Sequence, residues 1–148
     1  MESPEDIFIN SISERKIYYF STTKIRSSEP HYFICIKRTD NDILIMSCCT
    51  TKFDTIANFI TSRNLPNVTL VYIPAKNQKS PFPKDTYINC NEPLTFTIEE
   101  FKNLFNSKAI KFSGELSESF YEQILTGIHA STMIDAETKE VIPKPECI

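Results

Sequence analysis

The sequence predicts a small domain that is mainly β with some α structure, strand-rich in front and mainly helical in its last third. Three observations predict this class. Short β-prone runs separated by turn residues fill the front of the chain, and apolar residues at helical spacing mark the back. No apolar run approaches the roughly 20 residues of a membrane-spanning helix. We therefore expect a partly open barrel or sheet that is capped on one side by helices.

About six short strands are expected, because six runs are rich in β-branched and aromatic residues. Proline, asparagine and aspartate, which favour turns, lie between them. Residues 39–42, Thr-Asp-Asn-Asp, predict the turn of a hairpin. The expected strands cover residues 16–20, 31–36, 43–49, 68–73, 86–90 and 94–96.

One short helix is expected among the strands, and two helices are expected near the C-terminus. From Phe53 onward, apolar residues at i, i+3, i+4 and i+7 share one helical face, and this pattern ends at Asn64. Thr97 and Glu100 have the spacing of a capping box, which predicts the start of a second helix. Ser117 is a suitable cap for the third helix.

Composition predicts one domain in a chain of 148 residues, since 41% of the residues are hydrophobic and 24% are charged. We expect residues 1–14 to be an N-terminal extension, residues 15–134 to be the domain, and residues 135–148 to be a loosely ordered acidic tail. The acidic first residues do not resemble a signal peptide, so we expect a cytoplasmic protein that is not bound to a membrane.

Cysteine, histidine and glycine usage predicts neither a metal site nor a cofactor. The five cysteines contain no C-x-x-C pair, although Cys48 and Cys49 are adjacent, and His31 and His129 lie far apart in the sequence. We expect the cysteines to pack as small apolar residues. Two glycines are too few for the phosphate-binding and nucleophile-elbow motifs, so nucleotide-dependent enzymes and α/β-hydrolases are excluded.

Charge is unevenly distributed along the chain. Residues 15–84 hold eleven Lys and Arg against four Asp and Glu, a net charge of +7, whereas residues 85–148 carry −6. A basic strand-rich part predicts a surface that meets a polyanion. The alternative is that folding mixes these charges over the whole surface.

RNA cleavage is the chemistry that these residues support best, because the nucleophile is the substrate's own 2′-hydroxyl group. The protein then supplies proton transfer and positive charge. Lys24 and Arg26 precede the second expected strand, while Thr50 and Thr51 end the third. The alternative is that the threonines only end a strand or cap the next helix, and that the two basic side chains are solvated.

The order of the motifs resembles the PemK/MazF group of toxins over about residues 15–134. The resemblance is carried by the first two strand runs, by Cys-Cys-Thr-Thr ending at Thr51, and by Thr-Ile-Glu-Glu-Phe from Thr97. It implies a small SH3-like, partly open barrel, with Thr50 as the catalytic threonine. The family's catalytic arginine precedes the proline that begins the second strand. Here Glu29 stands before Pro30, and Arg26 is the nearest arginine.

The resemblance implies a metal-independent endoribonuclease that cleaves single-stranded RNA, acts as a homodimer and is neutralised by an antitoxin. Thr50 would orient the scissile phosphate, and Arg26 with Lys24 would stabilise its charge. RNA contacts are expected from Lys16, Thr51, Lys52, Lys76, Lys79, Phe82 and Lys84. Phe82 would stack on a base or, alternatively, anchor its loop to the core.

Two other functions remain open from the sequence. The first is a non-catalytic barrel that binds protein or RNA, which Glu29 in place of the arginine favours. The second is a toxin directed at gyrase on the same barrel.

Overall fold

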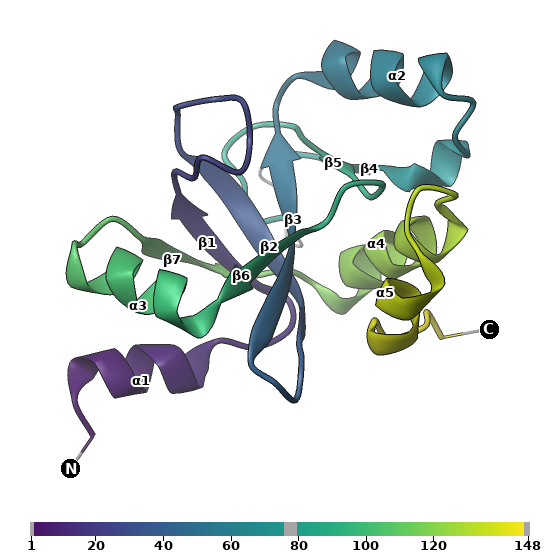
Figure 1. The fold of residues 1–148 in the computed structure, drawn as a ribbon. Coiled ribbons are helices and arrows are strands. Elements are labelled where there is room, and N and C mark those ends of the chain that lie inside the picture. Colours follow the sequence, from purple (N-terminus) through teal and green to yellow (C-terminus); the bar gives the residue numbers. More distant parts are fainter. Residues whose placement is uncertain (1, 76–79, 147–148) are drawn as a thin grey trace.

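An antiparallel sheet combined with helices makes up the computed structural model, which describes residues 2–75 and 80–146 (Figure 1). The strands are β1 (Lys16–Phe20), β2 (His31–Arg38), β3 (Ile43–Thr50), β4 (Leu70–Ile73), β5 (Thr86–Asn89), β6 (Leu94–Thr97) and β7 (Lys111–Glu115). The helices are α1 (Pro4–Ser11), α2 (Phe53–Ser62), α3 (Ile98–Asn106), α4 (Glu118–Ala130) and α5 (Ala136–Val141), and a 3₁₀ turn covers Asn67–Thr69.

Strand β3 joins the two parts of the sheet. It pairs with β2 along one edge, while its other edge pairs with β6 at residues 43–46 and with β5 at residues 49–50. The strand order is β4-β5-β3-β2-β1-β7, with β6 off this path. The described strands form one sheet that forks along β3 and is not closed. The predicted fold class, a mixture of strands and helices, is confirmed.

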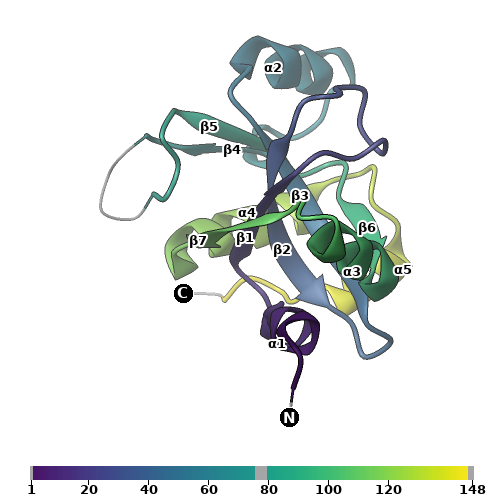
Figure 2. The same ribbon diagram turned by 90° about the vertical axis from the view of Figure 1, so that its left-hand side faces the viewer.

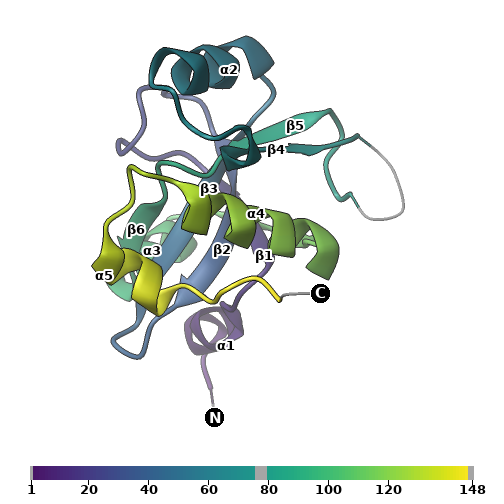
Figure 3. The same cartoon turned by 90° about the vertical axis from the view of Figure 1, so that its right-hand side faces the viewer.

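Alternating side chains of the central strands supply two separate cores, one on each face of the sheet. On β1, Ile17 faces one core, while Tyr18 and Phe20 face the other. Helices α4 and α5 cover the first face, and α1 and α3 lie on the second (Figures 1 and 3). The sheet is therefore buried on both faces over much of its length, which explains the nearly continuous apolar runs in β2 and β3.

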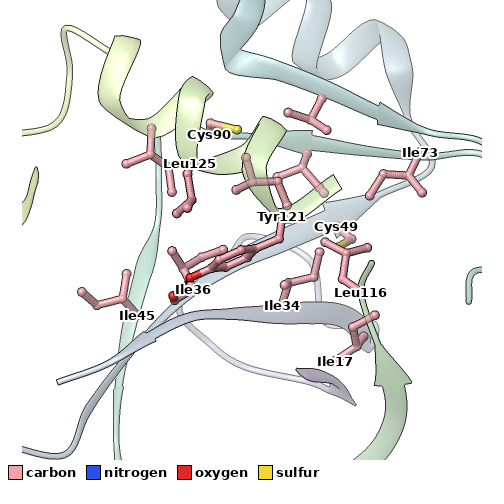
Figure 4. Packing of buried hydrophobic residues seen from close by; sticks show 14 of the residues in the cluster. Ile17, Ile34, Ile36, Ile45, Cys49, Ile73, Cys90, Leu116, Tyr121 and Leu125 are labelled. Atoms are coloured by element: carbon pink, nitrogen blue, oxygen red, sulfur yellow. Dashed lines mark hydrogen bonds between the residues drawn. The ribbon is translucent and has the colours of Figure 1, made fainter. Parts of the chain in front are cut away.

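The core under α4 is shown in Figure 4, where the Tyr121 ring lies between the helix and the sheet. The hydroxyl of Tyr121 donates a hydrogen bond to the Ile36 carbonyl oxygen at 2.7 Å, which satisfies its polar end inside the core. Gly127 allows α4 to approach closely, because a Cβ there would lie 2.7 Å from the Val68 carbonyl oxygen and from the Cys90 sulfur. Glycine at this helical position is thus explained by packing.

The three helices predicted from the sequence are present. Thr97 and Glu100 form the expected capping box of α3, and the Ser117 side chain accepts a hydrogen bond at the start of α4. Helix α2 buries Ile56 and Ile60 in a small third cluster against β4 and β5. Phe53, expected on the same face, is 47% exposed, because it lies at the first residue of α2, beyond that cluster.

Three elements were not expected, namely α1, β7 and α5, and the strand expected over residues 68–73 begins only at Leu70, after the 3₁₀ turn. Helix α1 lies in the region expected to be an extension, and Phe8 stacks on Phe105 of α3 with ring centroids 4.7 Å apart. Strand β7 is an edge strand whose Phe112 is 53% exposed, so its sequence lacks an alternating pattern. The tail forms α5, capped by Asp135, and buries Ile142 at 2% exposure. These elements are short and contain few apolar residues, so their apolar periodicity was too weak to predict them.

None of the helices in the described part of the chain is both long and apolar enough to cross a membrane.

Candidate functional site

A pocket of about 330 Å³ opens at one end of the sheet. It lies where β1 ends, β2 begins, β3 ends and β5 begins, and the loop between β1 and β2 lies at this end together with α2 (Figures 1 and 2). Aromatic, hydroxyl and charged side chains dominate its walls. The lining residues are Tyr19, Ser27, Glu29, Pro30, His31, Tyr32, Cys49, Thr50, Thr51, Lys52, Pro83, Lys84 and Thr86.

Antiparallel pairing explains why these residues meet. Tyr19 is paired with Tyr32 across β1 and β2, and Thr50 is paired with Tyr87 across β3 and β5. In antiparallel strands the end of one lies beside the start of the next, so residues distant in sequence share one sheet end. The Tyr19 and Tyr32 rings lie 4.7 Å apart and form an aromatic wall. Buried Phe82 packs edge-on against Tyr32 at 5.3 Å.

Four of the sequence-predicted residues line this pocket: Thr50, Thr51, Lys52 and Lys84. The Thr50 hydroxyl accepts a hydrogen bond from the Lys52 N–H at 3.1 Å, which bends the chain into α2. Neither lysine forms an ion pair with another described residue, and both side chains are exposed. Two cationic groups are thus free to meet an anion beside a hydroxyl group.

His31 lies in the same pocket, and sequence reasoning did not select it as a site residue. Its Nδ1 atom is 2.9 Å from the Glu29 carbonyl oxygen. A carbonyl oxygen only accepts hydrogen bonds, so Nδ1 carries the proton and Nε2 of the neutral ring is a proton acceptor. The signal in the sequence was a histidine directly after Pro30, at the start of a strand that pairs antiparallel with the strand ending at Thr50.

Lys24, predicted to be catalytic, is engaged elsewhere in the structure. Its ammonium group lies 3.2 Å from a Glu100 carboxylate oxygen and 2.5 Å from the Thr95 carbonyl oxygen. It also lies 4.5 Å from the centroid of the Phe96 ring. Partial burial raises the pKa of Glu100, but hydrogen bonds from Thr97 and Lys24 outweigh this, and the pKa is lower than usual. Lys24 therefore pairs with Glu100 in the first turn of α3 and does not line the pocket.

Other predicted residues also lie outside the pocket. Arg26 is exposed in the loop between β1 and β2 but is not among the lining residues. Lys16 lies at the opposite end of β1, where its ammonium group donates to the Ser11 carbonyl oxygen at 2.8 Å. Lys76 and Lys79 lie outside the described residues.

The expectation that Phe82 stacks on an RNA base is wrong, because this ring is 1% exposed and belongs to the core under α4. A base cannot reach a ring that is enclosed by protein. The alternative holds instead, in which Phe82 anchors its loop and supports the pocket wall through Tyr32.

Two cysteines lie at the pocket end of β3, where Cys49 lines the pocket and Cys48 precedes it. Burial raises the pKa of the Cys48 thiol to about 12, and it raises the pKa of Cys49 well above its ordinary value. A thiol attacks as the thiolate, and burial disfavours that form in both residues. Among residues 2–75 and 80–146, no three His, Cys, Asp or Glu side chains lie together in a way that would hold a metal ion.

No protein-family model matches the chain, and a search of curated proteins finds no similar sequence.

Proposed function

We propose that this protein is an endoribonuclease of the PemK/MazF type that cleaves single-stranded RNA at the pocket. The observation that supports this most is the meeting of Thr50, His31, Lys52 and Lys84 around one cavity. Cleavage by the 2′-hydroxyl of the RNA needs a proton acceptor and positive charge near the phosphate. The pocket contains both, and the aromatic wall beside them suits a nucleobase.

In the proposed reaction, His31 Nε2 accepts the proton of the RNA 2′-hydroxyl. The 2′ oxygen forms a bond to phosphorus while the bond from phosphorus to the 5′ oxygen breaks. A cyclic phosphate remains on one fragment, and the departing 5′ oxygen takes a proton from water at the open side of the pocket. The hydrogen bond from Nδ1 to the Glu29 carbonyl orients the ring and stabilises the imidazolium that forms.

Thr50, Lys52 and Lys84 hold the phosphate in this proposal. The Thr50 hydroxyl accepts the Lys52 N–H, so its own proton is free to be donated to a phosphate oxygen. The two ammonium groups balance the negative charge that grows on the phosphate oxygens as the new bond forms. Lysine acts here as a point charge, which tolerates different positions of the phosphate.

The proposal extends to the family, the fold and the partners. We propose that the forked open sheet is a variant of the SH3-like barrel of PemK/MazF toxins. In this view the protein acts as a homodimer, and an antitoxin blocks the pocket. Arg26 and Lys24 are not part of the proposed chemistry, because neither lines the cavity.

A second candidate function is a non-catalytic module that binds RNA or protein. It is favoured by one observation: Glu29 lines the pocket at the position where the family has its arginine, and no arginine is among the described lining residues. In that case the same cavity binds its partner without cutting it.

Incubation of the purified protein with a long single-stranded RNA tests the proposal. Wild-type protein is expected to cut the RNA but not its 2′-O-methyl counterpart, because methylation removes the nucleophile. His31→Ala is expected to lower the cleavage rate about 10²–10⁴-fold through loss of the proton acceptor. Thr50→Ala is expected to lower it about 10²-fold through loss of a hydrogen bond to the phosphate.

Thr55→Ala is the matched control, because Thr55 is exposed in α2 and does not line the pocket. It should cleave like the wild type. Cleavage by His31→Ala and Thr50→Ala at the wild-type rate would reject this site. RNA binding by the wild type without cleavage would favour the second candidate function.

A further inference from the structure

Three aromatic side chains form an exposed cluster next to the pocket, and the proposed chemistry leaves them unused. Phe53 is 47% exposed, Tyr72 is 45% exposed, and Tyr87 is half-buried. The Tyr72 and Tyr87 rings are stacked, with centroids 5.3 Å apart and planes 22° apart, and Phe53 lies 5.2 Å from Tyr87. We call these three residues the aromatic platform.

Strand register connects the platform to the candidate site. Thr50 on β3 is paired with Tyr87 on β5, and Tyr87 is paired in turn with Tyr72 on β4. Directly opposed residues of antiparallel strands project from the same face of the sheet. Thr50 therefore begins a row that crosses to Tyr72 over two interstrand spacings, roughly 10 Å. A nucleotide neighbouring a phosphate at Thr50 reaches the platform over this distance.

The platform is rigid at its base and open at its edges. Tyr87 packs against the small cluster that Ile56 and Ile60 of α2 form with Leu65, and this holds the ring in place. Phe53 and Tyr72 flank the Tyr87 ring, and both are largely exposed. A contiguous exposed apolar patch of this kind is typical of a binding surface. Desolvation and the nearby Asp85 carboxylate raise the pKa of Tyr72, so its phenol is neutral at physiological pH.

Two lysines and two aspartates lie in the segments that carry the platform, and only the lysines line the pocket. Lys52 directly precedes Phe53, and Lys84 lies three residues before Tyr87. Asp54 and Asp85 lie in the same segments, and the Asp85 carboxylate accepts the Ala75 N–H at 2.9 Å. The two lysines face the pocket, so the basic groups lie where phosphates would pass.

We propose that Phe53, Tyr72 and Tyr87 stack on the base of the nucleotide next to the phosphate held at Thr50, and so select single-stranded RNA. This inference rests on the proposed function. Unpaired bases expose π faces that stack on aromatic side chains regardless of sequence, whereas bases inside a duplex are already stacked. The platform would thus give preference for unpaired RNA without preference for one base.

Binding of a fluorescent single-stranded RNA with 2′-O-methyl groups tests the platform without cleavage. Tyr72→Ala is expected to weaken binding by about 5- to 150-fold, the loss that corresponds to one stacked base. Tyr72→Phe keeps the ring and should bind like the wild type. The dependence of affinity on salt should be unchanged in Tyr72→Ala, because no phosphate contact is removed.

Phe112→Ala is the matched control, since Phe112 is 53% exposed on β7 and does not line the pocket. It should leave RNA binding unchanged. Phe53→Ser tests the platform a second time if Tyr72→Ala does not fold, and it is also expected to weaken binding.

The possible failures are distinguishable. A wild-type protein that binds no RNA overturns the proposed function, and the platform with it. Wild-type affinity in both Tyr72→Ala and Phe53→Ser overturns the platform alone and leaves the pocket chemistry standing. Loss of a protein dimer in these variants, with RNA affinity unchanged, assigns the surface to protein contacts and overturns the inference.

Discussion

Basic side chains behave differently at the two ends of the β2–β3 hairpin. At the turn end, Arg38 donates to the carbonyl oxygens of Ile9 and Ile12 at 2.6 and 3.2 Å and pairs with Asp42 at 2.9 Å. At the pocket end, Lys52 and Lys84 form no ion pair with a described residue. One end uses positive charge to hold the N-terminal segment to the sheet, whereas the other leaves positive charge available to a ligand.

This contrast separates stability from function within one sheet. A guanidinium group that satisfies buried carbonyl oxygens contributes to folding, because its removal leaves acceptors without partners. Exposed lysines without acidic partners add little to stability, and their repulsion is relieved when an anion binds.

The largest effect is expected from Arg38→Ala. This change removes two hydrogen bonds from a charged donor to backbone carbonyls near α1, and should lower the free energy of unfolding by about 2 kcal/mol. Urea denaturation followed by circular dichroism measures the loss. Lys37→Ala, one residue earlier, is the control and should change stability little. If Arg38→Ala were as stable as the wild type, Arg38 would not stabilise the fold, and the contrast between the turn end and the pocket end of the hairpin would be wrong.

An intermediate effect is expected from Lys84→Gln. Stability should be unchanged, while the affinity for single-stranded RNA should fall, and the slope of log affinity against log salt should become shallower by about 0.7. Fluorescence anisotropy across a salt series measures both. Lys102→Gln, on α3 and away from the pocket, is the control. An unchanged slope would show that Lys84 does not contact phosphate.

The smallest effect is expected for the ion pair of Lys24 with Glu100, which lies in the first turn of α3. The folded-state pKa of Glu100 lies below the ordinary value of a glutamate. Its stabilising contribution is therefore present above that ordinary value and is lost as pH falls through the folded-state pKa. Glu100→Gln removes this dependence. The variant should therefore lose less stability than the wild type on acidification, by a few tenths of a kcal/mol for so exposed a pair.

Denaturation at neutral and acidic pH compares Glu100→Gln with Glu99→Gln, a change in the same first turn of α3. RNA cleavage by both variants should equal that of the wild type, because neither residue lines the pocket. A loss of cleavage in Glu100→Gln would indicate that Lys24, its partner, takes part in catalysis after all.

The sequence predicted the elements whose residues repeat a strong pattern. The aromatic and β-branched runs of β1 to β3 and the capping box at Thr97 identified their elements correctly. Helices α1 and α5 were missed because each is short and is stabilised by contacts with distant residues, such as Phe8 on Phe105. Such contacts leave no local periodicity for a sequence analysis to detect.

The candidate site was predicted in part for the same reason. Thr50 and Lys52 were identified because they follow a predicted strand, but His31 was considered as a metal ligand. The predicted hairpin implied antiparallel pairing of β2 with β3, but it did not fix the register, which is shifted between Cys35 and Lys37. His31 therefore could not be placed in the same pocket as Thr50 from the sequence. Lys24 was misplaced, since the direction of its side chain depends on Glu100, far along the chain.

The separate small cluster under α2 has a consequence for how the protein changes over evolution. Ile56, Ile60 and Leu65 pack with β4 and β5 and lie outside the two main cores. The pocket rim at Lys52 and the platform residue Phe53 belong to this same segment. If the proposed RNA site is correct, exchange of the exposed residues Lys52 and Phe53 would change what is bound while leaving the two main cores intact.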